Sequence, residues 1–387
     1  MKIAFISIMT RLPWGGSEFL WSEAARAALE EGHEVMASVF HWSKHQPAIR
    51  QLKGMGMRVT TRRRWPLPEP LQRISNRLAG EIYQRKWWPD PYAAIRRFNP
   101  DIICVSQGGS IDVAFDGVQR LLLESNKPFF LISQMNFEHK LYSMQIIPPL
   151  QAIFRKATRL FFVSERNREV LERQVCMKLP HGEVVANPVN LKEKKQLAFP
   201  AFENDTVQMA CVGRLECEAK GQDVLVQVLS SDTWKNRNWV LNFYGKGHHE
   251  AYLRLLGREF GISDRIFFHG HVSDIADIWR RNHLLVMPSL REGTPLALIE
   301  CMACGRPSVV TDVGGNADYC IEGKTGFLAQ APNVKYFGSA LERAWMDRER
   351  WEEMGMLAHQ FYTEHTDTEP GRSLLRKMLY YASQQQD

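Results

Sequence analysis

Residues 284–305 read LLVMPSLREGTPLALIECMACG, a short apolar run followed by a polar loop and a second apolar segment. The run from Leu284 to Pro288 has the length and composition of a buried parallel strand. A helix is expected from Pro295 to Cys304, because Thr294 is a suitable N-cap, proline is tolerated in a first helical turn, and Gly305 can end the helix. The strand, loop and helix predict an α/β fold, in which ligands bind at the carboxyl ends of strands.

Two carboxylates lie on either side of this predicted helix start. Glu292 precedes the helix and Glu300 lies inside it, roughly 7–8 Å further along at ~1.5 Å per residue. That span fits one sugar nucleotide, with sugar hydroxyls on Glu292, phosphate at the helix start and ribose hydroxyls on Glu300. A solvated first turn matched to the helix dipole is the alternative interpretation, and the buried strand before the loop favours a ligand. The other binding residues predicted here are Gly293, Thr294, Pro295 and Leu296.

Length and composition predict a well-cored globular protein of two domains, since the chain has 387 residues, 44% hydrophobic and 24% charged. The first residues, MKIAFISIM, resemble a buried strand more than a signal peptide, so we expect a cytoplasmic protein. The seven cysteines favour reduced thiols. Cys301 and Cys304 form a CxxC pair, for which simple packing is favoured over zinc or redox chemistry because no second ligand pair lies nearby.

Cations and tryptophans are dense in residues 61–98 of a chain whose formal net charge is +6. Two interpretations stay open: a solvated helix face with core tryptophans, or peripheral contact with an anionic membrane or a lipid-linked acceptor. We expect no nucleic-acid partner, because no nucleic-acid-binding motif accompanies the charge. The residues concerned are Arg62, Arg63, Arg64, Trp65, Arg73, Arg77, Arg85, Lys86, Trp87, Trp88, Arg96 and Arg97.

Strand-like runs alternate with helical patterns along the chain in two sets, which predicts two facing Rossmann-like domains with doubly wound parallel sheets. We expect a first domain over residues 1–186, a second over 187–369 with a linker at about 187–205, and a helix over 370–387 that returns to the first domain. The predicted strands are Ile3 to Met9, Glu34 to Phe40, Asp101 to Ser106, Phe129 to Ser133, Leu160 to Ser164, Val207 to Gly213, Trp239 to Tyr244, Arg265 to His269, Leu284 to Pro288 and Ser308 to Thr311.

Several short motifs follow one another in a fixed order. They are PWGGSE (13–18), VGRL (212–215), Lys220-Gly221, YGKG (244–247), FFHGHV (267–272), the Glu292 and Glu300 pair, and GGNAD (314–318). Each is weak alone, but together they resemble the retaining GT-B glycosyltransferases, a large family that includes sucrose synthase and bacterial mannosyl- and glucosyltransferases. The resemblance covers nearly the whole length and implies two Rossmann-like domains.

The resemblance implies an enzyme that transfers a hexose, with retention, from a UDP- or GDP-sugar to a glycan or lipid-linked acceptor. Cleavage at the anomeric carbon leaves negative charge on the diphosphate, so fixed positive groups must meet it. The candidates are Arg214, at the end of a strand, and Lys220, at the start of the following helix. The structural alternatives are a salt bridge for Arg214 and an ordinary surface lysine for Lys220. The sequence has no Asp-x-Asp pair to hold a divalent ion, so we expect metal-independent transfer and no cofactor.

Further site residues are implied by the resemblance. In this family Glu292 would contact donor-sugar hydroxyls and Glu300 the ribose. Gly15 and Gly16 would let the backbone approach the diphosphate or the acceptor, since side chains there would collide. Gly270 and His271 would border the base.

The chain departs from the family pattern after the strand 129–133, where many relatives have a histidine near the donor sugar. Gln134 or Asn136 would replace it as a hydrogen-bond donor to the sugar, and His139 lies a few residues further on. We take Asn136 as the candidate catalytic residue of the first domain. Asp318 likewise stands where the family has a glutamate.

Two other functions stay open from the sequence. The missing histidine fits a sugar-nucleotide-binding protein without turnover. A phosphorylase or epimerase could use the same architecture, although the sequence lacks the recognisable pyridoxal-phosphate lysine setting of GT-B phosphorylases.

Overall fold

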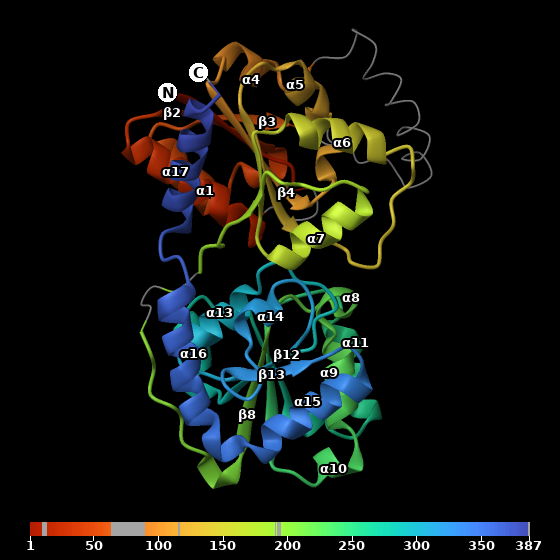
Figure 1. Cartoon of the computed structure of the whole chain (residues 1–387). Helices are drawn as coiled ribbons and strands as arrows, with labels where there is room; N and C mark the ends of the chain where they lie inside the picture. Colours follow the sequence, from red (N-terminus) through yellow and green to blue (C-terminus); the bar gives the residue numbers. More distant parts are fainter. Residues whose placement is uncertain (10–13, 63–89, 115–116, 190, 192–194, 386–387) are drawn as a thin grey trace. The chain divides into compact units, whose positions relative to one another are not determined.

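The computed structural model describes residues 1–9, 14–62, 90–114, 117–189, 191 and 195–385. The chain forms two compact units, one of Met1–Pro188 with Thr368–Asp387, the other of Val189–Asp367 (Figure 1). Residues 195–205, which we expected within a linker, lie along the second unit. There the Leu197 N–H donates to the Cys304 carbonyl at 3.2 Å.

The first unit contains a seven-stranded sheet in the order β3-β2-β1-β4-β5-β6-β7, with every pair parallel. The chain begins at the centre, builds outward to β3 and then returns to place β4 beside β1, which makes a topological switch point between β1 and β4. The strands are β1 (Lys2–Ser7), β2 (Glu34–Phe40), β3 (Arg58–Arg62), β4 (Ile102–Gly109), β5 (Phe129–Met135), β6 (Arg159–Phe162) and β7 (Gly182–Val184).

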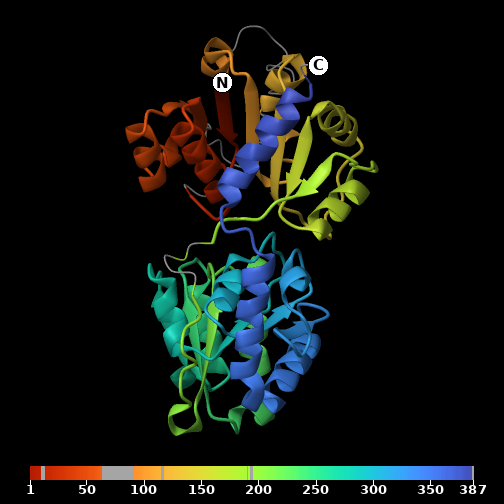
Figure 2. The same cartoon turned by 60° about the vertical axis from the view of Figure 1, so that its left-hand side comes forward.

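The helices described in this unit are α1 (Ser17–Glu30), α2 (Pro47–Gly54), α4 (Ala93–Phe98), α5 (Val118–Glu124), α6 (Ile147–Lys156), α7 (Glu165–Gln174) and α17 (Pro370–Ser383). They cover both faces of the sheet (Figure 2). Ile3 and Phe5 of β1 pack with α1, α2 and α17, whereas Ala4 and Ile6 pack with α4, α5, α6 and α7. Burial on both faces explains the continuous apolar sequences of the central strands.

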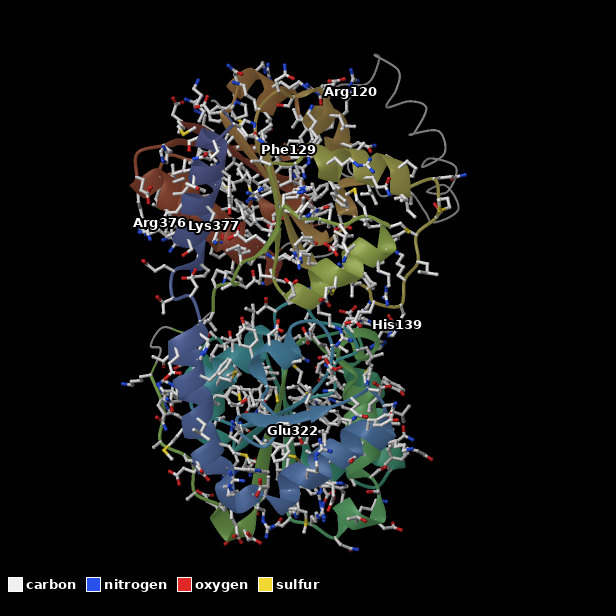
Figure 3. The ribbon with its side chains drawn as sticks, in the orientation of Figure 1. Arg120, Phe129, His139, Glu322, Arg376 and Lys377 are labelled. Carbon is white, nitrogen blue, oxygen red and sulfur yellow. The ribbon has the colours of Figure 1, made fainter. Side chains whose placement is uncertain are left out.

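The C-terminal helix α17 packs against α1 in the first unit (Figure 1). Its Arg372 forms ion pairs with Glu30 at 2.8 Å and with Glu31 at 3.0 Å. Lys377, labelled in Figure 3, pairs with Glu183 of β7. The last helix therefore connects α1 to an edge strand of the sheet.

The second unit contains a six-stranded parallel sheet in the order β10-β9-β8-β11-β12-β13. Its strands are β8 (Val207–Val212), β9 (Trp239–Tyr244), β10 (Ile266–Gly270), β11 (Leu284–Met287), β12 (Ser308–Thr311) and β13 (Gly326–Ala329). Its helices are α8 (Cys217–Lys220), α9 (Gln222–Leu229), α10 (Asp232–Lys235), α11 (Glu250–Glu259), α12 (Ile275–Arg281), α13 (Leu296–Ala303), α14 (Asn316–Tyr319), α15 (Val334–Met346) and α16 (Trp351–His365).

Both faces of this second sheet are also covered. One core contains residues of α9, α11 and α15, and the other contains residues of α12, α13 and α16. The predicted fold class, two doubly wound parallel-sheet domains, is therefore confirmed. The strands that the sequence did not predict, β3, β7 and β13, all lie at sheet edges.

Arg62 fits neither of the two interpretations of residues 61–98, because it ends strand β3 and is buried. Its side chain is buried, donates to the Ser38 hydroxyl at 2.6 Å, and lies over the rings of Phe40 and Tyr92 at 4.7 and 5.0 Å from their centroids. A guanidinium with these partners cannot contact a membrane surface. The other cations and tryptophans of this segment, except Arg96 and Arg97, lie outside the described residues.

Candidate functional site

The sheet of the second unit has its topological switch point between β8 and β11. From β8 the sheet extends through β9 to β10, and the chain then returns to place β11 on the other side of β8. Loops that leave the two strands turn in opposite directions, and doubly wound sheets bind ligands in the crevice that results. Lys220 lies in the segment after β8, and Glu292 lies in the loop after β11.

Lys220 and Glu292 form an ion pair, with 2.6 Å between Nζ and Oε1. The Glu292 side chain is 8% exposed and the Lys220 side chain 21%. The Ser289 hydroxyl donates to the same Oε1 at 2.6 Å. A buried charge is costly unless it is paired and hydrogen-bonded, and this carboxylate has both kinds of partner. The structure therefore brings two predicted site residues into direct contact.

Two details of the predicted helices are wrong. The helix with Glu300 begins at Leu296, because Pro295 has non-helical backbone angles (φ −78°, ψ 90°) and occupies the N-cap position that we assigned to Thr294. Lys220 does not open the following helix. It ends the one-turn helix α8, and Gly221, at φ +63°, separates α8 from α9.

Two glycines let the loop with Glu292 lie close to its neighbours. A Cβ on Gly221 would stand 2.2 Å from the Pro288 carbonyl oxygen, and one on Gly314 would stand 2.2 Å from that of Glu292. Both glycines have positive φ, which side-chain-bearing residues rarely adopt. Because the colliding atoms are backbone, no side-chain movement could relieve either contact.

Backbone hydrogen bonds hold the same loop from both sides. The N–H groups of Leu290 and Arg291 donate to the Ala219 carbonyl at 2.9 and 3.2 Å. On the other side, the Gly315 N–H donates to the Gly293 carbonyl at 2.9 Å. The loop is therefore fixed before any ligand arrives, which is the preorganisation that a binding site needs.

The start of α13 and Glu300 follow the Glu292 loop directly in the sequence of the second unit. Glu300 is 6% exposed and lies inside α13. Thr294 and Pro295 are buried, while Gly293 and Leu296 are partly exposed. The first N–H groups of α13 lack intrahelical partners, as at any helix start, and the positive end of its dipole favours an anion there.

Arg214 follows β8 but has a partner other than Glu292. Its guanidinium forms an ion pair with Glu216 at 2.7 Å, and its side chain is 53% exposed. An exposed ion pair of this kind contributes little to stability. Arg214 can therefore exchange Glu216 for an anionic ligand at low free-energy cost.

The motifs after β8, β9 and β10 lie side by side. A Cβ on Gly245 would stand 1.9 Å from the Gly213 carbonyl oxygen, and the Gly245 N–H donates to the Gly270 carbonyl at 2.7 Å. His271 follows Gly270 and is exposed. Close backbone packing between the loops therefore explains Gly245. A Cβ on Gly270 would meet the Lys246 side chain at an ordinary 3.5 Å, and it is the positive φ of +68° that favours glycine there.

In the first unit, Gly15 and Gly16 lie between β1 and α1, beside the other switch point. Gly16 has ordinary helical angles (φ −53°), and a Cβ on Gly15 would meet the Met9 side chain at an ordinary 3.6 Å. The fold itself does not require glycine at either position. The expectation that a ligand approaches this backbone therefore stays a prediction.

Asn136 differs from the sequence expectation. It is 2% exposed, and its side-chain N–H donates to the Asn167 carbonyl at 2.6 Å. One of the two amide N–H donors that the sequence prediction assigned to a sugar is therefore used within the fold. Gln134 is also buried, where its oxygen accepts from the Asn187 amide at 2.8 Å, and His139 is exposed (Figure 3).

Glu18 is a buried carboxyl that sequence reasoning missed, although it closes the PWGGSE motif. It is 1% exposed and accepts hydrogen bonds from the Ser7 hydroxyl and the Trp21 indole, both at 2.9 Å. Burial raises the pKa of Glu18 to about 7, against the lowering effect of these hydrogen bonds and of Arg62. The only sequence signal was an acidic residue in a first helical turn.

We expect Glu18 to make stability fall as the pH rises. Between the ordinary pKa of 4.5 and the folded-state pKa of about 7, the folded protein holds a proton that the unfolded chain has lost. The contribution of Glu18 to the free energy of unfolding is therefore greatest below pH 4.5. It decreases by about 3 kcal/mol as the pH rises to 7. Urea unfolding of the unmodified chain and of Glu18→Gln at several pH values should show this slope only in the former. Glu34→Gln, a control at an exposed position, should keep the fall of the unfolding free energy with pH. If the unfolding free energies of Glu18→Gln and the unmodified chain differ by the same amount at every pH, the prediction is wrong.

Cys301 and Cys304 pack within α13 and its C-terminus, where both are buried. Burial raises the pKa of Cys304 to about 12 and raises that of Cys301 as well. Thiols protonated at neutral pH are poor nucleophiles and poor metal ligands. Within the described part of the chain, no group of three or more His, Cys, Asp or Glu side chains is arranged to hold a metal ion.

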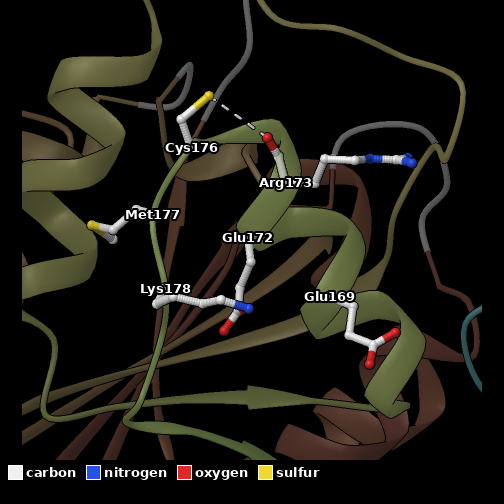
Figure 4. Close-up of a pocket in the computed structure, with 6 residues that line it drawn as sticks. All are labelled: Glu169, Glu172, Arg173, Cys176, Met177 and Lys178. Atoms are coloured by element: carbon white, nitrogen blue, oxygen red, sulfur yellow. Dashed lines mark hydrogen bonds and ion pairs between the residues drawn. The ribbon is translucent and has the colours of Figure 1, made fainter.

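A surface hollow of about 510 Å³ lies at the C-terminal end of α7 in the first unit (Figure 4). Its lining includes Lys178, which pairs with Glu172 at 2.8 Å, and Cys176, whose thiol points to the Arg173 carbonyl oxygen. None of the predicted site residues lines it. We assign it no function.

The two parallel-sheet units, with polar motifs at the carboxyl ends of their strands, have the GT-B fold of glycosyltransferases. Residues 206–347 match the family model described as Glycosyl transferases group 1. The chain thus has the GT-B fold, and residues 206–347, within its second unit, are similar in sequence to the group 1 glycosyl transferases.

The two relatives compared by sequence align with only part of this chain. An uncharacterized glycosyltransferase of Haemophilus influenzae is 31% identical over 159 residues, which cover 41% of this chain and 44% of the relative. The lipopolysaccharide core biosynthesis mannosyltransferase LpcC of Rhizobium leguminosarum is 33% identical over 141 residues, which cover 35% of this chain and 39% of the relative. The matches thus span less than half the length of these relatives.

Solved structures resemble the whole chain. HepE of Anabaena, crystallised with UDP, has a TM-score of 0.71 at 16% identity, covering 98% of this chain and 100% of that one. Sucrose-phosphate synthase of Thermosynechococcus elongatus has a TM-score of 0.74 at 18% identity, covering 98% and 99%. At these identities the likeness establishes the fold. Among the described residues, every helix is too short or too polar to cross a membrane.

Proposed function

We propose that this protein is a retaining hexosyltransferase that uses a nucleoside diphosphate sugar and requires no divalent metal. The observation that carries the proposal is the Lys220–Glu292 pair, 2.6 Å apart at the switch point of the second unit. An ammonium suits a diphosphate, and a carboxylate suits sugar hydroxyls. Both sides of the carboxylate loop are fixed by backbone contacts, as a site for one defined ligand requires.

In the proposed reaction, the bond between the anomeric carbon and the diphosphate oxygen breaks while the acceptor oxygen bonds to the same face of that carbon. Lys220, Arg214 and the amides at the start of α13 stabilise the negative charge on the departing diphosphate. The departing oxygen takes the proton of the acceptor hydroxyl, so no separate strong base is needed. Glu292 holds the sugar and stabilises positive charge at the anomeric carbon.

The proposed substrates follow the site and the relatives. HepE was solved with UDP, and LpcC is described as a mannosyltransferase of lipopolysaccharide core biosynthesis. The first description supports a UDP-sugar donor and the second a glycan acceptor. The proposal includes a GDP-sugar as the other donor and a lipid-linked glycan as the other acceptor. We propose action at the cytoplasmic side of a membrane, with peripheral contact through part of residues 61–98.

Thermal unfolding with a panel of sugar nucleotides tests the donor. UDP-glucose, UDP-galactose and GDP-mannose should raise the unfolding temperature by different amounts. The correct donor at 100 times its Kd should stabilise the folded protein by about 2.7 kcal/mol. Glu292→Ala should reduce the shift from the sugar nucleotide more than the shift from the free nucleoside diphosphate. If none of these nucleotides changes the unfolding temperature, the proposal fails.

Product analysis tests the reaction itself. Anomeric proton NMR should show the configuration of the donor sugar in the product. Transfer should continue after EDTA treatment, because cationic side chains and amides take the place of a metal ion. An inverted product or loss of transfer to the chelator would exclude the proposed mechanism.

A further inference from the structure

The Lys220–Glu292 pair sets a problem for the proposed reaction. Glu292 Oε1 accepts from Lys220 Nζ and from the Ser289 hydroxyl, both at 2.6 Å. In the proposed function, the Lys220 ammonium also has to reach the diphosphate. As Nζ turns to the phosphates, the carboxylate loses part of its charge compensation in a place where it is 8% exposed.

Ser289 can keep that carboxylate in place. It is the residue that follows Pro288 after β11, and it is 0% exposed, so its hydroxyl cannot turn to solvent. The Thr311 hydroxyl donates to the Ser289 carbonyl at 2.5 Å, which anchors the serine backbone to β12. The Ser289 hydroxyl therefore approaches Oε1 from a backbone position that is fixed at the carboxyl end of β11. Lys220 approaches the same atom on a flexible side chain.

We propose that Ser289 is the positioning residue of Glu292, holding Oε1 while Lys220 engages the diphosphate. Oε2 then stays oriented toward the hydroxyls of the donor sugar. This inference rests on the proposed function, and it concerns only the sugar end of the ligand. Ser289 touches neither the sugar nor the phosphates in this scheme, so it acts through Glu292.

The first test is Ser289→Ala in the full chain, with whichever of UDP-glucose, UDP-galactose and GDP-mannose the unmodified chain turns over. Loss of a hydrogen bond to a charged group should lower kcat roughly 10-fold to 100-fold. The Kd of the matching free nucleoside diphosphate, UDP or GDP, should stay unchanged, because it has no sugar for Glu292 to hold. Weakened binding of the free nucleoside diphosphate would overturn the inference.

A double-mutant cycle separates positioning from simple damage to the loop. If Ser289 acts through Glu292, Ser289→Ala should cause no further loss of kcat/KM in the Glu292→Ala background. Equal losses in both backgrounds would show that Ser289 supports the fold and not the carboxylate. A fully active Ser289→Ala would likewise overturn the proposal.

Ser308 supplies a matched control. It is also 0% exposed, at the start of β12, and its hydroxyl contacts the Cys320 thiol at 3.8 Å. Ser308→Ala removes an equally buried hydroxyl, and we expect normal kcat. A loss equal to that of Ser289→Ala would point to a general effect of buried hydroxyls.

Binding makes the test independent of turnover. The ratio of the Kd for UDP to the Kd for UDP-glucose, or of GDP to GDP-mannose, measures the contribution of the sugar to affinity. Ser289→Ala should reduce this ratio toward one. If the unmodified chain binds none of these nucleotides, the proposed function fails and this inference with it, whereas a ratio unaffected by Ser289→Ala overturns the inference alone.

Discussion

Lys220→Ala should lower sugar transfer by about 100-fold to 1000-fold, the range found when a charge-stabilising donor is removed from an active site. Lys220 meets the developing charge on the diphosphate in the proposed mechanism. The same substitution should destabilise the second unit by about 2–3 kcal/mol, because it leaves the 8%-exposed Glu292 carboxylate without its ion-pair partner. This estimate is below the full value for a buried pair, since Lys220 itself is 21% exposed.

The double variant Lys220→Met with Glu292→Gln separates the two effects. It removes both charges and keeps most of the side-chain volume, so much of the lost stability should return. Transfer should not return. Urea unfolding and initial transfer rates measure the two quantities, and recovery of both together would show that Lys220 serves the fold alone.

Lys235→Ala is the matched control for this prediction. Lys235 ends α10 as Lys220 ends α8, and each helix has four residues, but Lys235 is exposed. We expect its replacement to change stability by less than about 0.5 kcal/mol and transfer not at all. Transfer lost equally in both variants would mean that the site lies elsewhere.

Arg306→Met should destabilise the second unit by about 3–5 kcal/mol, because it leaves several buried carbonyls without this donor, at roughly 1–3 kcal/mol for each carbonyl that finds no other. Arg306 is 0% exposed, and its guanidinium donates only to backbone carbonyls. Methionine fills the volume of the stem but donates nothing, so these carbonyls lose a charged donor. The accepting residues are Leu197, Ala198, Trp279, Asn282, Cys304 and Gly305.

Urea unfolding and hydrogen exchange test this second effect. Leu197 and Ala198 belong to the extended segment along the second unit, so the Leu197 amide should lose protection in Arg306→Met. The control Arg254→Met removes an arginine that is 48% exposed and paired with Glu250, and it should cost no more than about 0.5 kcal/mol. Similar decreases in the free energy of unfolding for Arg306→Met and Arg254→Met would contradict a stabilising role for the buried hydrogen bonds of Arg306.

The central strands were predictable, as was the edge strand β10, but the other edge strands of the described residues were not. β1, β4, β5, β8, β11 and β12 have neighbours on both sides and helices on both faces, so their sequences are apolar runs. β3, β7 and β13 are edge strands with the sequences RVTTR, GEV and GFLA. Short or polar runs of this kind carry no strand signal, because an edge strand needs less burial.

The candidate site was predictable in its composition but not in its contacts. The sequence indicated Lys220 and Glu292, and the fold brings them together across the switch point. The sequence gave no sign that the Ser289 hydroxyl also donates to the Glu292 carboxylate, because a serine after a strand has many ordinary roles. The sequence also gave no sign that the Arg62 guanidinium and the Asn136 amide nitrogen donate hydrogen bonds within the first unit.

By itself, the sequence determined that this protein has two parallel α/β domains and that a lysine and two glutamates follow strands of the second. Those features depend on local periodicity and on the rule that ligands meet the carboxyl ends of strands. Tertiary structure alone decided which polar atoms are bound to one another and which cations are buried. Such pairings join residues far apart in the chain, 72 positions for Lys220 and Glu292, and a distance of a few ångströms between them is set by the packing of the whole domain.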